Sequence, residues 1–518
     1  MYAKVLGSSI LGIDGFLVEI EVDLANGLPQ FQIVGLPDSS IRESKDRVRA
    51  AIKNSGYSFP IKRITINLAP ADIKKEGSGF DLPMAIGILI ASEQIDIGDS
   101  ETNLEKTLFI GELSLDGSIH GINGILPMAI EAKQKNIERL ILPNQNVDEA
   151  RLVQGIEVFG FSHLQEVIEF LTTNRYPSLE DKNSEYIAFN SFVESEVEDF
   201  IDVKGHVQVK RAIEVAVAGM HNLLMIGPPG SGKSMIAKRI PSVLPLLTWD
   251  EMLEVTKIYS VAGELNERGK LMAKRPFRQP HHSISAAGLI GGGSNPKPGE
   301  ISLAHRGILF LDELPEFPRH SLESMRQPLE DGKVTVSRAR ATYVFPSQVM
   351  LVGAMNPCKC GYYGTEVPGH ECQCTPLEVQ RYRSRLSGPL LDRIDIHIEV
   401  PWMNIETLRE QKEGKSSQMM RETIERARMM QKQRFANERI QFNSEMNAKQ
   451  VKQFCQLEQE AENLLRHSFD QLGFSGRSLD RILKISRTIA DFEESETIKV
   501  AHLAEAINYR VLDRRELL

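Results

Sequence analysis

The feature that most constrains this chain is the segment 227–234, which reads Gly-Pro-Pro-Gly-Ser-Gly-Lys-Ser. A short apolar segment ends just before it at Ile226, and a segment with helical character begins at Met235. Glycines let backbone amides approach phosphate oxygens, and the N-terminus of a following helix adds partial positive charge. The segment therefore predicts a nucleoside-triphosphate site between a strand and a helix, within an α/β fold.

We call residues 227–234 the phosphate loop. In this pattern Lys233 is expected to reach the β- and γ-phosphates, and Ser234 is expected to hold Mg²⁺. All eight members are candidate nucleotide contacts: Gly227, Pro228, Pro229, Gly230, Ser231, Gly232, Lys233 and Ser234.

A second motif lies downstream, where the apolar segment 307–311 ends in Asp312 and Glu313. Asp312 is expected to help fix Mg²⁺, and Glu313 is expected to polarise an attacking water. The alternative is a polar end to a buried strand, which the preceding phosphate loop makes less favoured. The two motifs together predict ATP hydrolysis.

The composition narrows the class of protein. Apolar residues make up 41% and charged residues 25% of the 518 residues, as in an ordinary globular protein of about three domains. The formal net charge of −9 excludes a generally basic nucleic-acid coat, so any such contact must be local. Five cysteines in this length make no disulfide framework. We see no signal peptide and no membrane-spanning segment, and expect a cytoplasmic protein.

The pattern along the chain predicts four segments. Residues 1–175 read as a compact α+β domain, 176–195 as a polar linker, 196–405 as the nucleotide-binding core, and 406–518 as charge-rich helices. The expected elements of the first segment are strands at 16–23, 64–68 and 140–143, helices at 40–55, 81–91 and 125–135, and a hairpin at 113–119. Its Asp116-Gly117 pair suits a primed turn.

Between the two nucleotide motifs lies a glycine-rich insertion, residues 275–299. The triple glycine 291–293 predicts a mobile loop rather than a second phosphate site. His281 and His282 are adjacent, so their side chains diverge, and no carboxylate lies near them in the sequence. Loop polarity is favoured over metal binding.

A basic hairpin is expected after the carboxylates. Residues 332–345 read as two short strands, and Lys333, Arg338 and Arg340 supply three positive charges without an acid. Arg338 and Arg340 project on the same side of an extended backbone. The hairpin could hold a DNA phosphate backbone, or it could be a solvated turn beside an acidic neighbour. The next apolar strand ends at Asn356, which could orient the attacking water.

Four of the five cysteines follow as two pairs: Cys358 with Cys360, and Cys372 with Cys374. Eleven residues separate the pairs, and clustered thiols suit a closed tetrahedral Zn²⁺ site. The one-residue gap within each pair is less usual than two, so free thiols remain the alternative. His370 could replace one ligand.

These motifs, together with Pro298-Gly299-Glu300, Asn356-Pro357-Cys358 and Leu390-Leu391-Asp392-Arg393, resemble the Mg-chelatase-like branch of AAA+ ATPases. Within that branch the chain resembles the ComM/YifB family over essentially its whole length. The resemblance implies an AAA+ P-loop core with a C-terminal helical lid, and a ring of six subunits with ATP at each subunit boundary. It also implies that Arg393 is an arginine finger supplied to the neighbour, and that Arg477 contacts ATP in its own subunit.

The first segment resembles the proteolytic domain of the Lon family, on the stretches 75–82 and 111–143. That family uses a Ser–Lys pair, but here Asp81 falls near the serine position and Leu126 near the lysine position. Ser78 with Lys74 or Lys75 could substitute. A domain without proteolytic activity is the favoured reading.

The resemblance implies an ATP-dependent hexameric DNA motor, with helicase or branch-migration activity in homologous recombination and natural transformation. Its implied cofactors are ATP and Mg²⁺; structural Zn²⁺ is expected from the cysteine pattern alone, with free thiols as the alternative. Its implied partners are single-stranded or branched DNA, other copies of the chain and recombination proteins. The alternatives are a chelatase-type motor that remodels a protein partner and, less favoured, an ATP-dependent protease.

Overall fold

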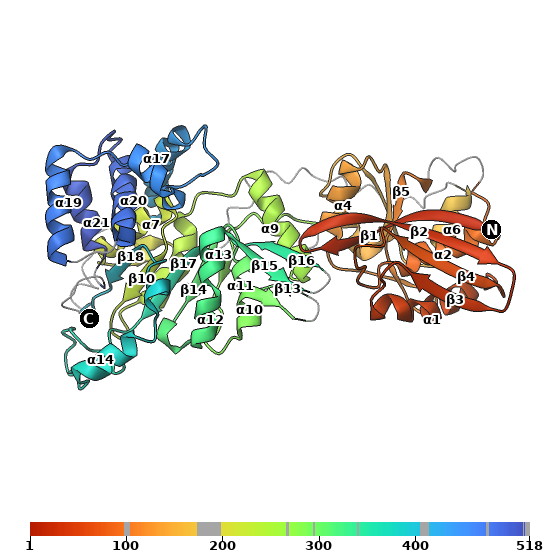
Figure 1. The fold of residues 1–518 in the computed structure, drawn as a ribbon, viewed down its shortest axis with the longest axis horizontal. Coiled ribbons are helices and arrows are strands. Elements are labelled where there is room, and N and C mark those ends of the chain that lie inside the picture. The colour runs from red at the N-terminus through yellow and green to blue at the C-terminus, as the bar shows by residue number, and fades with distance from the viewer. Residues whose placement is uncertain are drawn as a thin grey trace.

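The structure is a computed structural model that describes residues 1–97, 104–173, 198–265, 269–293, 296–338, 341–404, 414–472, 476–510 and 512. Figure 1 shows an elongated molecule with a sheet-rich unit at one end and a helical unit at the other. We call residues 1–173 the N-terminal unit, 198–404 the core unit and 414–510 the helical unit. The linker expected at 176–195 lies outside the described residues.

The N-terminal unit is built on a mixed seven-stranded sheet with the order β3-β4-β2-β1-β5-β8-β9. Its strands are β1 (Tyr2–Leu11), β2 (Asp14–Ala25), β3 (Gln30–Val34), β4 (Arg63–Ala69), β5 (Thr107–Phe109), β8 (Arg139–Pro143) and β9 (Glu157–Phe161). The β1–β2 and β2–β4 pairs are antiparallel, and the other pairs are parallel. The helices are α1 (Ser39–Asn54), α2 (Asp81–Ala91), α4 (Ile125–Gln134), α5 (Val147–Ala150) and α6 (Leu164–Thr173).

The alternation of apolar and polar residues explains which side chains of this sheet are buried. In β2 the side chains of Val18, Ile20 and Val22 are fully buried, and Glu19 and Glu21 between them face outward, because successive side chains of a strand point to opposite faces. Helix α2 is apolar on nearly all sides, and it packs against both β1–β2 and α1. These elements confirm the strands and helices expected for this unit.

The hairpin expected at 113–119 is confirmed as β6 (Glu112–Leu113) paired with β7 (Ile119–His120). The primed turn is wrong, because Asp116 does not have a positive φ. Only Gly117 does, at +93°, and its N–H donates to the Ser114 carbonyl at 3.0 Å. A three-residue loop that ends in a left-handed glycine replaces the two-residue turn.

The core unit contains a five-stranded parallel sheet with the order β11-β14-β17-β10-β18. Its strands are β11 (Phe277–Arg278), β14 (Ile308–Leu311), β17 (Met350–Met355), β10 (Leu223–Ile226) and β18 (Ile396–Glu399). The carboxyl ends of parallel strands share one edge, where ligands of open α/β sheets bind. The phosphate loop follows β10, Asp312 follows β14 and Asn356 follows β17 at that edge.

Helices cover this sheet on both sides, and short elements fill the connections. They are α7 (Val207–Gly219), α8 (Lys233–Arg239), α9 (Trp249–Ala262), α10 (Ala286–Ile290), α11 (Glu300–Leu303), α12 (Arg319–Ser324), α13 (Arg326–Asp331), α14 (Pro376–Arg383) and α15 (Gly388–Leu391). The expected basic hairpin is confirmed as β15 (Lys333–Ser337) paired antiparallel with β16 (Thr342–Pro346). At the triple glycine, the structure has a strand pair rather than an irregular loop: β12 (Gly291–Gly292) pairs with β13 (Lys297–Pro298).

The helical unit contains α17 (Ser417–Arg434), α18 (Ala448–Phe454), α19 (Gln459–Leu472), α20 (Gly476–Phe492) and α21 (Val500–Asn508). Helix α20 packs on α7, α17 and α21, and its apolar stripe joins the core that covers one face of the five-stranded sheet. Five 3₁₀ turns complete the described chain: η1 (Asn144–Asn146), η3 (Phe200–Asp202), η4 (Ile240–Val243), η5 (Leu314–Glu316) and η6 (Asn443–Glu445). Among the described helices, none is both long enough and apolar enough to cross a bilayer.

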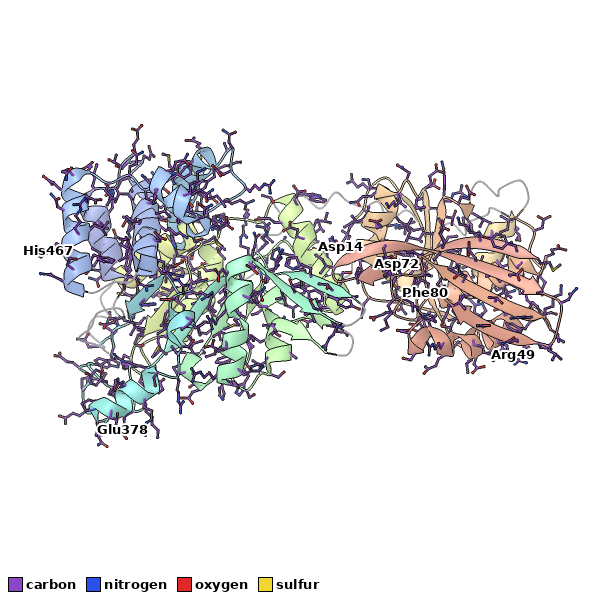
Figure 2. The ribbon with its side chains drawn as sticks, viewed as in Figure 1. Asp14, Arg49, Asp72, Phe80, Glu378 and His467 are labelled. Carbon is purple, nitrogen blue, oxygen red and sulfur yellow. The ribbon has the colours of Figure 1, made fainter. Side chains whose placement is uncertain are left out.

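The N-terminal unit contacts the core unit through the tip of the β1–β2 hairpin, which lies beside β16 in Figure 1. Ile13 at this tip is buried in the apolar cluster of the core unit. Asp14, labelled in Figure 2 at this junction, forms an ion pair with Lys257 of α9 at 2.6 Å. Nearby, Ser260 of α9 donates a hydrogen bond to the buried carboxylate of Glu149 at 2.5 Å.

Candidate nucleotide-binding site

The phosphate loop takes a shape that requires its glycines. Gly230 and Gly232 have φ values of +75° and +88°, which L-residues with side chains rarely adopt. A Cβ on Gly227 would lie 2.2 Å from the Val400 carbonyl oxygen. Helix α8 begins at Lys233, two residues before the expected start at Met235, so its N-terminus faces the loop directly.

The Lys233 ammonium is turned toward its own loop. It donates to the carbonyls of Gly227 at 2.7 Å and Pro228 at 2.8 Å, and it lies 3.3 Å from Oδ1 of Asn356. Burial lowers the pKa of Lys233 to about 8, and the nearby Asp312 carboxylate opposes that shift. An ammonium with three donors in this position can exchange carbonyl partners for phosphate oxygens.

The fold brings together Ser234 of α8 and Asp312, which follows β14. The Ser234 hydroxyl donates to Oδ2 of Asp312 at 2.6 Å, and Oδ1 of Asp312 accepts the Glu313 N–H at 3.0 Å. A hydroxyl and a carboxylate are the hard oxygen ligands that Mg²⁺ prefers. These two side chains could therefore hold Mg²⁺ beside the phosphate loop.

Glu313 projects from a strained backbone. Its φ is +50°, although it is not a glycine, and its side chain is 61% exposed. Such outliers cluster at functional sites because the surrounding structure must hold them in place. The carboxylate is thus open to water.

His282 is a neighbour of this site that the sequence did not reveal. Its Nδ1 lies 3.7 Å from Oε2 of Glu313, and its ring lies against that of His281 with centroids 4.1 Å apart. We expected no carboxylate near these histidines; this is wrong, because folding brings Glu313 next to His282. No periodicity links the two segments, so the sequence held no signal for this contact.

Arg393, the expected arginine finger, is held by α13 and α15 in the part of the chain that the structure describes. Its guanidinium donates to the Arg326 carbonyl at 2.9 Å, to the Pro389 carbonyl at 2.8 Å and to the Glu330 carboxylate. Arg477 is 74% exposed and lies 3.6 Å from Asp392, the residue before Arg393. A contact of Arg477 with ATP in its own subunit remains a prediction.

The segment around Arg393 is also fixed to the helical unit. Arg481 of α20 pairs with Asp395 at 2.5 Å, and His221 contacts the same carboxylate at 3.3 Å. Arg510 donates to the Ile394 carbonyl at 2.7 Å. Burial raises the pKa of Asp395, but Arg481 and His221 outweigh burial and hold it well below its usual range. Movement of the helical unit would therefore displace Arg393.

The basic hairpin has a more specific environment than the sequence indicated. Lys333 and Arg338 are exposed, and Arg338 donates to the Gly293 carbonyl at 2.7 Å, which joins the hairpin to the β12–β13 pair. Near the tip of the hairpin, the Tyr343 hydroxyl donates to Glu76 of the N-terminal unit at 3.4 Å. Arg340 lies outside the described residues.

The four clustered thiols converge. The Sγ atoms of Cys358, Cys360, Cys372 and Cys374 all lie within 4.8 Å of one another. The alternative ligand His370 instead stacks on Tyr362, with ring centroids 4.7 Å apart and planes 5° from parallel. Four cysteines are therefore the ligand set that this loop offers to Zn²⁺.

The N-terminal unit does not assemble a Ser–Lys pair among its described residues. Ser78 donates to the Glu112 carboxylate, Lys74 pairs with Glu76 at 2.6 Å, and Lys75 donates to backbone carbonyls, including Ile73 at 2.8 Å. At the serine position, Asp81 accepts two hydrogen bonds from Arg47. The substitute pair considered from the sequence is not formed.

Three family models that describe magnesium chelatase match this chain. The model for magnesium chelatase, subunit ChlI, matches residues 199–408, and the model for the ChlI C-terminal region matches residues 414–510. A further model for subunit ChlI of Mg-chelatase matches residues 20–146. Competence protein ComM of Haemophilus influenzae is 43% identical over 514 residues, which cover 99% of this chain and 98% of the relative.

This chain belongs to the ComM/YifB family of Mg-chelatase-like AAA+ proteins. Protein YifB of Escherichia coli strain K12 is 42% identical over 505 residues, covering 97% of this chain and 96% of that protein. The family assignment made from the motifs is therefore confirmed.

Two partial matches connect this ComM/YifB member to other proteins. Lon protease 2 of Bacillus subtilis is 28% identical over 185 residues, 32% of each chain. A probable DNA helicase, MCM9 of Arabidopsis thaliana, is 24% identical over 192 residues, which cover 37% of this chain and 24% of the relative.

Proposed function

We propose that the protein is an ATP-driven motor that acts on DNA as a ring of six subunits. Its activity would be helicase or branch migration in homologous recombination and natural transformation. The competence protein among its relatives supports a role in natural transformation, and the partial match to a probable DNA helicase supports contact with DNA. The Mg-chelatase-like family supports ATP hydrolysis.

The observation that carries the proposal is that Arg393 is bonded to the helix that leads directly into the basic hairpin. Arg393 bonds to the Arg326 carbonyl and to Glu330, both on α13. Helix α13 ends at Asp331, and β15 of the hairpin begins two residues later at Lys333. A phosphate that draws Arg393 away from α13 therefore changes the support of the hairpin.

We propose roles for the residues of the nucleotide site; the geometry supports those of the phosphate loop, Ser234, Asp312 and Glu313. Lys233 and the phosphate-loop amides would bind the phosphates, and Ser234 and Asp312 would hold Mg²⁺, which would neutralise phosphate charge. Glu313 accepts a proton from the attacking water, and Asn356 orients that water. Arg393 of one subunit completes the site of the next, and Arg477 adds a second positive charge at the nucleotide.

In the proposed motor, Lys333, Arg338 and Arg340 grip DNA phosphates. A cluster of three cations can bind DNA although the net charge of the chain is −9, because the contact is local. The helical unit acts as the lid, and the N-terminal unit is a Lon-like domain without proteolytic activity. Recombination proteins are expected partners, and the cytoplasm is the expected compartment.

Subunit mixing tests the shared site. Lys233→Ala and Arg393→Ala should each lose ATP hydrolysis, by about 10³–10⁵-fold for the arginine finger. An equimolar mixture should regain turnover, because some boundaries then combine an intact phosphate loop with an intact Arg393. A mixture that is as inactive as its parents would show that each subunit hydrolyses ATP alone.

DNA contact is tested separately, with Arg338→Ala/Arg340→Ala as the variant. We expect DNA-stimulated ATPase to disappear while basal turnover remains. Arg466→Ala, an exposed arginine of α19, is the matched control and should keep stimulation. Unchanged stimulation in the double variant would show that the hairpin does not grip DNA.

A chelatase-type motor that remodels a protein partner is the second candidate. The three magnesium chelatase models favour it, since they match most of the chain. The two candidates differ in salt dependence, because phosphate contacts release counterions. Stimulation by DNA that falls steeply between 50 and 200 mM salt, roughly the range where phosphate contacts weaken, supports the DNA motor.

A further inference from the structure

The cysteine loop, residues 356–375, has the geometry of a zinc site. The Sγ atoms of Cys358 and Cys360 are 3.3 Å apart, those of Cys358 and Cys372 are 3.8 Å apart, and those of Cys360 and Cys372 are 3.6 Å apart. Tetrahedral Zn²⁺ with Zn–S bonds of about 2.3 Å places sulfur atoms roughly 3.8 Å apart. The thiols therefore need only small shifts to ligate Zn²⁺.

Apart from a few local hydrogen bonds and the Tyr362–His370 stack, the cysteine loop has little to order it. Between Met355 and Pro376 it contains no helix or strand, and most side chains from Glu366 to Thr375 are exposed. A segment without a core of its own requires an external constraint, and metal ligation supplies one because the binding free energy becomes folding free energy.

This loop lies directly against the phosphate loop. Gly361 has a φ of +94°, and a Cβ there would lie 2.6 Å from Cδ of Pro229. The Gly361 N–H donates to the Cys358 carbonyl at 3.1 Å, so one turn joins a metal ligand to this contact.

The same turn begins at the nucleotide site. Asn356 precedes Cys358 by two residues, and its Oδ1 lies 3.3 Å from Nζ of Lys233. The Pro357 carbonyl between them accepts a hydrogen bond from Arg383 at 3.2 Å. This bond restrains the backbone from Asn356 to Cys358.

We propose that the four cysteines bind one Zn²⁺ and that this metal positions Asn356 and Pro229 in the nucleotide site. The inference rests on the proposed ATPase activity and adds a structural requirement to it. Zinc has no chemical step here. It fixes the turn 358–361, and through that turn it sets the position of Asn356 and the shape of the phosphate loop.

Two variants of the full-length protein separate metal binding from positioning. Cys372→Ser removes one ligand, and it should lose zinc and lower both turnover and affinity for a fluorescent ADP analogue. Gly361→Ala keeps all four thiols but forces the loop off Pro229. It should retain one zinc per chain while turnover falls about 10–100-fold, the usual effect of a misplacement near 1 Å.

Each variant has a matched control. Cys455→Ser replaces the fifth cysteine, which is buried in the helical unit away from the cluster, and it should retain both zinc and turnover. Gly364→Ala lies in the same loop with a φ of +68°, but a Cβ there meets nothing within 4 Å. It carries similar backbone strain without the contact to the phosphate loop, so its turnover should stay within about twofold of wild type.

The readouts are zinc content by elemental analysis, affinity for the ADP analogue, melting temperature and steady-state ATPase. Wild-type protein that binds no zinc when given Zn²⁺ alone would overturn the metal site. Gly361→Ala with full zinc, wild-type affinity and wild-type turnover would overturn the positioning role. If wild type itself lacks ATPase activity, the proposed function fails, but zinc content and nucleotide affinity still decide this inference.

Discussion

Two aspartates, one in the N-terminal unit and one in the core unit, differ in how firmly their carboxylates are bonded. Asp81 begins α2 in the N-terminal unit and is completely buried. It accepts two hydrogen bonds from Arg47, at 2.7 and 3.1 Å, and one from the Leu113 N–H at 3.2 Å. Asp312 ends β14 in the core unit, is half-buried, and is bonded to a single side chain, that of Ser234 at 2.6 Å.

The comparison shows two uses of a carboxylate. Asp81 stabilises the fold, whereas Asp312 remains able to bind a ligand. The acceptors of Asp81 are taken by permanent partners, so it can stabilise but cannot react. The Asp312 carboxylate is bonded to one hydroxyl and one backbone N–H, which a metal ion can replace at modest cost. The neighbouring Glu313 is exposed on a strained backbone.

The largest expected effect is on ATP turnover, when the exposed carboxylate of Glu313 is replaced. Glu313→Gln should lower ATP turnover by about 10²–10⁴-fold, because the amide cannot accept the proton of the attacking water. Nucleotide affinity should remain near wild type. Steady-state ATPase and equilibrium binding measure the two effects. Glu316→Gln, three residues later in an exposed pair with Arg385, is the control and should leave turnover unchanged.

The next effect concerns stability rather than activity. Asp81→Ala leaves the partly buried Arg47 without its partner, and it should lower the free energy of unfolding of the N-terminal unit by about 3–5 kcal/mol. Urea denaturation measures it. Asp23→Ala, at an exposed position, should change stability by no more than about 0.5 kcal/mol. A large loss of ATPase in still-folded Asp81→Ala protein would contradict the purely structural role.

The pH dependence of nucleotide binding tests Lys233. Burial lowers its pKa from 10.5 to about 8, so the free protein loses this charge as the pH rises through 8. Bound phosphates favour the ammonium, so binding above pH 8 must take up a proton. Affinity should therefore be nearly constant below pH 7 and fall about fivefold between pH 8 and 9. Lys233→Arg keeps its charge throughout this range, and its affinity should show no such fall.

The smallest effect is expected at Ser78. Ser78→Ala removes one hydrogen bond to Glu112, and it should cost about 0.5–1.5 kcal/mol of stability with no change in ATPase. Neither wild type nor the variant should degrade casein with ATP. Degradation by wild type that disappears in Ser78→Ala would restore the protease hypothesis. The N-terminal unit would then be catalytic rather than purely structural.

Much of the fold was predictable because its signals are local. Periodicity identified α1, α2 and α4 and the hairpin β15–β16 close to their observed bounds. The primed turn at Asp116-Gly117 was wrong, since Asp-Gly pairs fit both turn types and the strand register decides between them. The β12–β13 pair was missed because glycine-rich strands of two residues have no periodicity to detect.

By itself, the sequence determined the family, the phosphate loop and the Asp312–Glu313 motif, because each is a contiguous pattern whose chemistry depends on neighbouring residues. The tertiary structure decided which distant groups meet: Asn356 with Lys233, His282 with Glu313, Arg393 with α13, and four thiols around one point. The first two contacts arise because parallel strands bring their carboxyl ends to one edge, and the pairing order of strands is a property of the whole sheet rather than of any one segment.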